Sequence, residues 1–282
     1  MKKIIIQLLL IFFVAFQGNA QNKDSVKVNH WYPGATAGIN ISQLALSNWT
    51  KGGDNQLTWT LTGNFSLKYL FTEWTNRSQL KFAFGRMKLG GNEFRTNDNE
   101  LYLETVLSKN VGWAVDPFFS SSVRSGIAVG YNYKKTPPDD IADFFDPGYI
   151  TQSLGFTYDK YEGIKTRLGF AVQEIFTNKY RQYSDNPQTS EKEAFKLETG
   201  LESVTNAGFT IMENVVLKSI LRLFSRYEHL DVWDIRWDNN LIAKINGYLN
   251  VNLVYILVYE KNQSPTAQMK ESLQLGFVYT II

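Results

Sequence analysis

The chain has no cysteine, and only two of its 282 residues are histidine. The lack of cysteine excludes a disulfide framework, thiolate metal sites and a lipidated cysteine anchor. With His30 and His229 alone, we expect no site of clustered imidazoles, and a Ser-His-acid triad would have to use one of the two. The sequence also contains no recognisable nucleophile elbow and no glycine-rich phosphate loop. We therefore expect no metal and no other cofactor.

A strong excess of charge of one sign is also missing. Lysine and arginine number 29 against 27 acidic residues, which leaves a formal net charge of +2. A nucleic-acid-binding protein needs a clustered basic surface that neutralises phosphates, and this sequence has none. We expect no nucleic-acid partner.

Apolar runs of the length needed for a membrane helix are absent. Residues 1–20 are predicted to be a cleaved signal peptide, with Lys2 and Lys3, a short apolar stretch over 4–16 and small residues at Gly18 and Ala20. Its apolar stretch is shorter than the ~20 residues of a spanning helix. Residues 21–33 would then be a periplasmic N-terminal segment. Because no run of about 18 apolar residues follows, an exported membrane protein of this sequence would have to span as a closed β-barrel.

The aromatic residues, 15% of the chain, belong to a pattern that alternates with period two. From Gln56 to Phe71, apolar residues at odd positions alternate with threonine, asparagine, serine and lysine, and only Gly63 interrupts the apolar series. The same period recurs over 164–172, 249–259 and 273–281. A strand with this period has one apolar and one polar face. A soluble β-sandwich also alternates, but its strands are usually ~5–6 residues long, whereas these runs of about 11 to 16 residues suit a tilted membrane crossing.

The connections between the predicted strands alternate between long and short. We predict strands over 34–41, 56–71, 78–89, 99–110, 113–133, 149–159, 163–177, 193–205, 208–225, 231–245, 247–260 and 270–281. Short turns are centred on 75–76, 110, 159–162, 206 and 246–247, and the other connections are longer. Outer-membrane barrels have short periplasmic turns and longer outer loops. We therefore predict an all-β fold, a transmembrane antiparallel up-and-down β-barrel of about 12 strands over residues 34–282, with both termini in the periplasm.

Two motifs in the predicted outer loops resemble a known family. The first is Asn48-Trp49-Thr50-Lys51-Gly52-Gly53, and the second is Phe144-Phe145-Asp146-Pro147-Gly148-Tyr149-Ile150. They resemble a Bacteroidetes outer-membrane β-barrel family catalogued as a domain of unknown function, and this resemblance implies a location but no activity. The glycines and Pro147 suit tight turns, so the motifs are predicted to fold a loop over or into the barrel mouth. Alternatively, Trp49, Phe144 and Phe145 present an aromatic surface to a ligand or partner protein.

Two sets of outer-loop residues raise the question of chemistry. Asp139, Asp140, Asp143 and Asp146 concentrate carboxylates as calcium prefers, but their spacing is not that of an EF-hand, and a solvated acidic loop is the favoured interpretation. His229 lies between Glu228 and Asp231, which leaves a hydrolase at the barrel rim as an alternative. We do not expect an enzyme.

The polar face of the strands is predicted to line the lumen. Its charged residues carry both signs with an excess of cations. A barrel of about 12 strands encloses either a narrow pore or a closed, salt-bridged interior. The predicted lumen residues are Lys68, Lys81, Glu104, Arg124, Lys165, Arg167, Lys196, Glu198, Glu202, Lys218, Arg222, Asp234, Arg236, Asp238 and Lys244.

Three functions follow from these patterns. The leading hypothesis is a narrow pore or transporter in the bacterial outer membrane for small, anionic solutes. The second is a non-conducting envelope component that binds a partner protein through its outer loops. The third is the rim hydrolase, which would depend on His229. The expected partners are outer-membrane lipid and either a small solute or another envelope protein.

Overall fold

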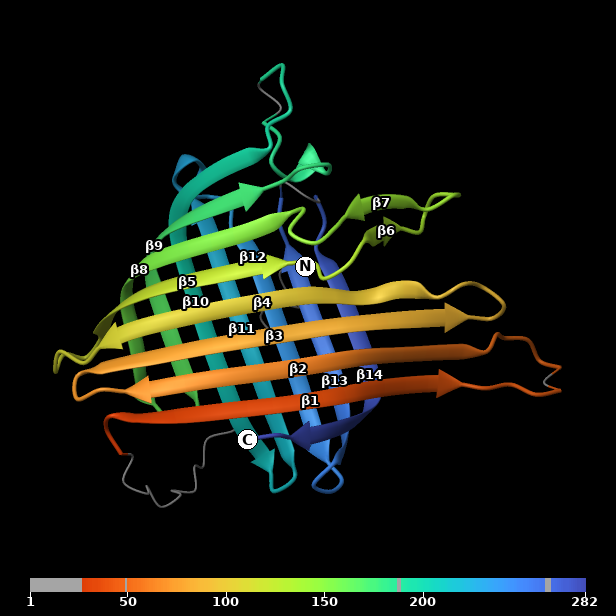
Figure 1. Ribbon diagram of the computed structural model, residues 1–282, viewed down its shortest axis with the longest axis horizontal. Coiled ribbons are helices and arrows are strands. Elements are labelled where there is room, and N and C mark those ends of the chain that lie inside the picture. Colours follow the sequence, from red (N-terminus) through yellow and green to blue (C-terminus); the bar gives the residue numbers. More distant parts are fainter. Residues whose placement is uncertain (1–26, 49, 187–188, 262–264) are drawn as a thin grey trace.

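The computed structural model describes residues 27–48, 50–186, 189–261 and 265–282. The predicted signal peptide, residues 1–20, lies outside them. The described chain forms a closed barrel of twelve strands in the order β1-β14-β13-β12-β11-β10-β9-β8-β5-β4-β3-β2 (Figure 1). The barrel strands are β1 His30–Leu44, β2 Gln56–Leu70, β3 Trp74–Leu89, β4 Arg95–Lys109, β5 Asp116–Ser125, β8 Gly148–Tyr161, β9 Ile164–Phe176, β10 Phe195–Met212, β11 Val215–Arg226, β12 Asp234–Lys244, β13 Leu249–Tyr259 and β14 Gln268–Thr280.

Neighbouring strands are antiparallel throughout, and β14 pairs with β1 to close the barrel. The predicted all-β, up-and-down barrel is confirmed. Two 3-10 turns, η1 Arg181–Tyr183 and η2 Tyr227–His229, lie in the connections. In the described part of the chain, no helix is long and apolar enough to cross a bilayer.

The strand predicted over 113–133 is present, but its predicted limits are wrong, because β5 runs only from Asp116 to Ser125. The chain then leaves the barrel, and β6 (Gly130–Asn132) pairs with β7 (Asp139–Ala142) in a separate two-stranded sheet. The side chain of Asn99 on β4 fixes this departure. Its Oδ1 accepts the backbone N–H groups of Ile127 at 2.7 Å and Ala128 at 3.0 Å, so the bend satisfies donors that a continued ladder would have used.

The predicted turn at Asn206 is also wrong, because β10 continues to Met212 and the turn lies at 213–214. Asn206 pairs with Ile220 inside the ladder, where a polar residue on the lumen face is favourable. Asn214 lies in the observed turn, and its Nδ2 donates a hydrogen bond to the main-chain carbonyl of Lys244 at 3.3 Å. The turn predicted at 75–76 lies at 71–73, and β1 begins at His30 rather than residue 34, so part of the predicted segment 21–33 belongs to a strand.

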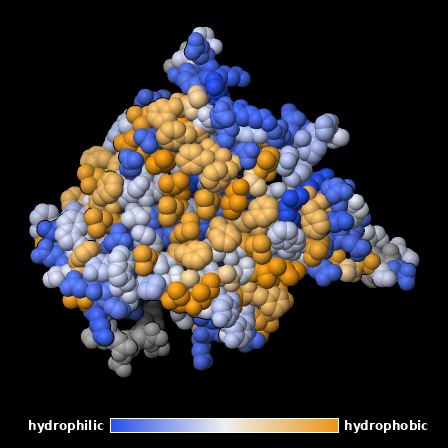
Figure 2. Space-filling view, in the orientation of Figure 1, coloured by the Kyte–Doolittle hydropathy of each residue, from blue (hydrophilic) through white to orange (hydrophobic). Residues whose placement is uncertain are grey.

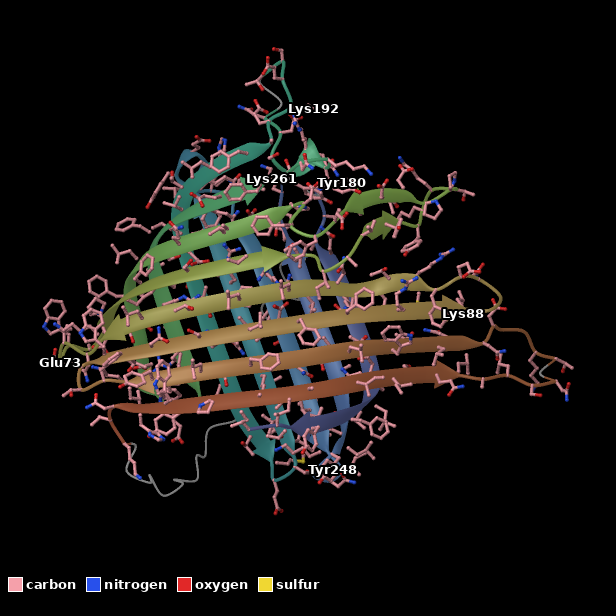
Figure 3. The ribbon with its side chains drawn as sticks, viewed as in Figure 1. Glu73, Lys88, Tyr180, Lys192, Tyr248 and Lys261 are labelled. Carbon is pink, nitrogen blue, oxygen red and sulfur yellow. The ribbon has the colours of Figure 1, made fainter. Side chains whose placement is uncertain are left out.

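The two ends of the barrel differ in the length of their connections. At one end, called here the turn end, the connections are 71–73, 110–115, 162–163, 213–214 and 245–248. The opposite end, called the loop end, carries 45–55, 90–94, 126–147, 177–194, 227–233 and 260–267. In Figure 3, Glu73 and Tyr248 mark the turn end, while Lys88, Tyr180 and Lys192 mark the loop end. Most loop-end connections are longer than their neighbours, as predicted.

The exterior of the barrel is apolar. Outward-facing side chains such as Leu154, Leu168 and Phe170 are 61%, 56% and 68% exposed, and Figure 2 shows apolar residues spread across the visible wall. On this face the ring of Phe82 lies where a Cβ of Gly63 would be, which explains the gap in the apolar series. Exposed aromatic residues follow the turn end, including Trp31, Trp74, Trp113, Tyr161 and Tyr248. An apolar wall with an aromatic rim is the exterior of a membrane-spanning barrel.

Candidate functional site

Charged side chains cross the middle of the lumen. Glu100 on β4 and Arg236 on β12 belong to opposite strands, because five strands lie between them in either direction round the barrel. Even so, Nη2 of Arg236 lies 2.7 Å from Oε2 of Glu100, while Nε of Arg124 on β5 lies 3.5 Å from Oε1. A pair between opposite walls leaves no wide channel at this level.

A second group lies beside this pair. Glu104 on β4 forms an ion pair with Arg167 on β9, and it accepts the hydroxyl of Tyr102 at 2.8 Å. Arg124 stands over the ring of Tyr102, 5.2 Å from its centroid. The Arg167 side chain is only 8% exposed, so this pair is desolvated and closely packed. These six residues are called the mid-lumen layer: Glu100, Tyr102, Glu104, Arg124, Arg167 and Arg236.

The wall from β8 to β12 holds further ion pairs. Arg222 lies 2.7 Å from Glu202, whose other oxygen accepts the hydroxyl of Ser153. Arg226 bridges Glu198 and Asp234, at 2.8 Å from each. Since each carboxylate there is 10% exposed or less, this side of the lumen is filled rather than open.

Two cavities lie at the two ends of the lumen. The turn-end cavity has a volume of about 260 Å³, and its lining includes Glu104 and Arg167. The loop-end cavity has a volume of about 410 Å³, and its lining includes Glu100 and Arg236. The mid-lumen layer therefore stands between the two cavities.

The turn-end cavity is cationic. Lys68, Arg77, Lys165 and Arg167 line it, with Glu104 as its single acidic residue. Arg77 pairs with Asp159 at 3.0 Å and Arg167 pairs with Glu104, but no ion pair joins Lys68 or Lys165 to a carboxylate in the described chain. Two lysines that form no ion pair in the described chain give the cavity a local excess of positive charge that suits a small anion.

The remaining predicted lumen residues occupy varied positions. Lys196 lies 2.8 Å from Glu198, and Asp238 lies 2.9 Å from Arg236. Lys81 is half-buried, with Asp238, Glu104 and Glu100 as charged neighbours. Lys218 and Lys244 are exposed. The structure adds charged residues that the sequence analysis did not select: Arg77, Asp98, Glu100, Asp159, Arg226 and Lys270.

The first loop motif shapes the β1–β2 connection. Asn48, Gly52 and Gly53 have φ angles of 54°, 82° and 113°, so this loop uses the left-handed conformations expected of such residues. Asn55 Oδ1 accepts the backbone N–H of Leu46 at 2.6 Å and ties the loop together. Trp49 lies outside the described residues. Figure 1 shows the hairpin extending away from the barrel mouth rather than into it.

The second motif joins two loops. The carboxylate of Asp146, which is 7% exposed, accepts the backbone N–H groups of Asn178 at 2.9 Å and Lys179 at 2.8 Å. The N–H of Phe145 donates to Ser125 Oγ at 2.6 Å, and its ring packs over Gly148. Pro147 and Gly148 follow at the start of β8. Phe144 is the one exposed residue of this motif, with 60% of its surface accessible. The other residues of the motif are at least partly buried and hold the connection between β9 and β10 in place.

The aspartates of the same loop are separately engaged. Asp139 pairs with Lys135, and Asp140 pairs with Lys179 while accepting the hydroxyl of Tyr180 at 2.8 Å. These hydrogen bonds from Lys179 and Tyr180 lower the pKa of Asp140. Asp143 Oδ1 accepts the N–H of Phe144 at 2.7 Å. The described residues contain no group of three or more potential metal ligands.

The two histidines lie far from the lumen layer. His30 begins β1, and its ring packs edge-on against Tyr32 at 4.9 Å between centroids. His229 ends η2, where the Ser225 hydroxyl donates to its main-chain carbonyl at 3.4 Å rather than to its imidazole.

Comparison with known proteins gives a partial family match. Residues 41–131 match the model of a family described as "Protein of unknown function (DUF3078)". This stretch contains the first loop motif but not the second. No curated protein matches the chain.

Solved barrels resemble the structure distantly. The COG4313 outer membrane channel from Pseudomonas putida F1 has 12% identity and a TM-score of 0.38, over 94% of this chain and 99% of that one. The translocator domain of the autotransporter NalP from Neisseria meningitidis has 9% identity and a TM-score of 0.36, over 91% and 90%. The beta domain of the Bordetella autotransporter BrkA has 10% identity and a TM-score of 0.28, over 88% and 98%. Similarity at this level carries no information about a solute or partner.

Proposed function

We propose that the protein is an exported outer-membrane β-barrel that forms a narrow pore or transporter for small anionic solutes. Its place in a membrane is supported by the apolar exterior and the aromatic residues at the turn end. The observation that carries the solute preference is the pair of lysines, Lys68 and Lys165, that line the turn-end cavity without an ion-pair partner in the described chain. A small anion entering that cavity would replace water around two ammonium groups that form no ion pair in the described chain.

The mid-lumen layer limits what passes. Glu100 and Arg236 meet across the barrel, so a solute would have to displace or circumvent that pair. This geometry suits small ions and excludes bulky substrates. The proposed pore therefore combines a cationic binding cavity with a narrow ion-paired constriction.

The test is ion selectivity in a planar bilayer under a salt gradient. We compare the purified protein with a variant carrying Lys68→Gln and Lys165→Gln, and with a control carrying Lys88→Gln and Lys192→Gln. Both control lysines lie at the loop end, away from the cavity (Figure 3). The proposal expects a reversal potential that favours anions in the native protein and the control, and a shift toward zero in the cavity variant. Cation selectivity of the native protein, or the same reversal potential in the native protein and the cavity variant, would reject the proposed anion preference.

A non-conducting barrel that binds a partner protein is the second candidate. The observation in its favour is that the ion pairs cross the lumen while Asp146 fixes two loop-end connections together beside the exposed Phe144. A folded, reconstituted protein without conductance would support this candidate. We propose no catalytic role for the protein.

We further propose that the resemblance to the Bacteroidetes family of unknown function extends to the second loop motif.

A further inference from the structure

The seam that closes the barrel is paired over only part of its length. Strands β1 and β14 pair from Thr36↔Thr280 to Ile41↔Leu275. On their other sides, β1 remains paired with β2 as far as Leu44, and β14 remains paired with β13 as far as Gln268. Continuing this register would pair residues 42–44 of β1 with 272–274 of β14, but the described chain has no ladder there, and residues 268–271 of β14 lie beyond the end of β1.

The two strands diverge at this point. Figure 1 shows β14 turning from its contact with β1 into the far wall, while β1 continues beside β2 toward the loop end. Gly276, the partner of Asn40, lies in the last part of the paired seam. Glycine in a strand commonly marks a bend at a barrel corner.

Three asparagines hold the seam together where the pairing stops. Asn252 Nδ2 on β13 donates to Asn40 Oδ1 on β1 at 3.0 Å and to Asn250 Oδ1 at 2.6 Å. This bridge passes over Gly276, since a Cβ there would lie 2.5 Å from Asn252 and 2.6 Å from Asn40. The paired part of the seam therefore has a fixed, hydrogen-bonded end, and the opening begins directly beyond it.

The unpaired edge of β14 lies at the boundary of the apolar exterior. Met269 and Leu273 are 64% and 63% exposed, and the exposed Glu271 between them places this stretch at the outer margin of the apolar band. An unpaired strand edge is not stable against lipid, because its N–H and C=O groups find no partner there. It is tolerated where it borders a polar cavity or where a ligand covers it.

The loop-end cavity adjoins this edge. Gln268, Met269 and Lys270 of β14 line it, next to Ile256 and Val258 of β13. Lys270 reaches Asp98 on β4 at 2.7 Å, so an ion pair spans the lumen side of the opening. The cavity thus has an apolar wall beside the edge and charged groups at its inner side.

We propose that the unpaired stretch between β1 and β14 is a lateral portal through which the loop-end cavity binds a single-chain amphiphile with a carboxylate head. The acyl chain would lie along Ile256 and Val258 and leave through the portal toward the outer half of the membrane. The carboxylate would replace Asp98 as the partner of Lys270. This site takes a different chemical class from the small anions of the proposed pore and uses a different opening.

The first test measures whether the seam is open. Continuing the register from Ile41↔Leu275 would place Gln43 opposite Leu273, so one variant carries Gln43→Cys with Leu273→Cys. The matched control carries Ile39→Cys with Phe277→Cys, an observed pair on the same outward face. The chain has no other cysteine. We expect the control to form at least about five-fold more disulfide on oxidation, because cysteines bridge only at short Cβ separation. Equal yields would show a continuous ladder and overturn the portal.

The second test locates the ligand. Diazirine-bearing lauric acid is photolysed with the native protein in phosphatidylcholine vesicles, and the labelled residues are identified by mass spectrometry. We expect label at Ile256 and Val258 several-fold above that at Val106 and Val204, which line the turn-end cavity. Label confined to lipid-facing residues such as Leu273, or equal label in both cavities, would overturn the proposal. This labelling experiment does not depend on ion conductance. Its result can therefore contradict the proposed portal without contradicting the proposed pore, and the conductance experiment can do the reverse.

Discussion

Arg236 Nη2 on β12 lies 2.7 Å from Glu100 Oε2 on β4, although the two strands stand opposite each other in the barrel. Glu100 also lies 3.5 Å from Arg124, so one carboxylate links three strands across the lumen. The side chains of Glu100 and Arg236 are 29% and 17% exposed, which reduces the screening of their attraction by water. This contact narrows the lumen, and we expect it to contribute to the stability of the barrel.

Replacing Glu100 with glutamine should destabilise the barrel. The change leaves Arg124 and Arg236 without that carboxylate in a partly desolvated layer, and we expect a loss of about 2 kcal/mol in the free energy of unfolding. The measurement is urea unfolding in detergent or lipid. Glu73→Gln is the control, since Glu73 is 62% exposed and 3.5 Å from Lys109 at the turn end. Equal stability of the two variants would contradict the role of the layer.

Substitution of Gly276 should weaken the closure of the barrel. An added Cβ would overlap Asn250 Oδ1 and crowd Asn252 and Asn40, so Gly276→Ala is expected to cost about 1–3 kcal/mol. Gly208→Ala is a matched control, because a Cβ there meets nothing within 4 Å. Both are measured by the temperature at which the folded band is lost on gels. Equal melting temperatures of the two variants would contradict this role of Gly276.

Loss of the Asp146 carboxylate should release the connection between β9 and β10. Asp146→Ala leaves the N–H groups of Asn178 and Lys179 without their acceptor, at a local cost of about 1–3 kcal/mol. Trypsin should then cut faster at Arg181, while the barrel stays folded. Asp139→Ala, which removes only an exposed ion pair with Lys135, should leave the cleavage rate unchanged. Resistance of Asp146→Ala to trypsin would argue against this latch.

The contact between Asp140 and Lys179 should make the backbone hydrogen bonding of residues 178–184 sensitive to pH. Hydrogen bonds from Lys179 and Tyr180 lower the pKa of Asp140, so its contribution is present above the ordinary carboxyl pKa and is lost as the pH falls through the lowered value. The hydrogen bond to Asp140 raises the pKa of Lys179, so that contribution is lost only as the pH rises through the raised value.

Hydrogen exchange of amides 178–184, corrected for intrinsic rates, measures this dependence. We expect protection to fall on the acid side in the native protein and to change little with pH in Asp140→Asn. A parallel fall in both proteins would place the pH dependence elsewhere.

The period-two pattern, the lack of long apolar runs and the alternation of long and short connections together predicted the barrel, its approximate strand number and the polar face of most strands. It failed where turn-forming residues stood inside a ladder, as Asn206 does, and where β5 ended at Ser125 without a loss of alternation. Local sequence could not distinguish these cases, because Asn206 is paired by β11 and the bend after Ser125 is held by Asn99 from another strand.

The lumen residues were only partly predictable for a related reason. Arg77, Asp98 and Arg226 follow the same alternation, but each lies just outside the predicted limits of its strand. Which charges meet across the lumen depends on the tilt and register of the strands, and neither can be read from the sequence of a single strand. The contact of Glu100 with Arg236 therefore required the structure.

The most direct measurement is single-channel conductance in planar bilayers for the native protein and the Glu100→Gln variant, recorded under identical salt. We predict small unitary steps in the native protein and larger steps in Glu100→Gln, since the variant weakens the pair that crosses the lumen. Steps of equal size, or silence from both folded proteins, would contradict a pore that is narrowed by this ion pair.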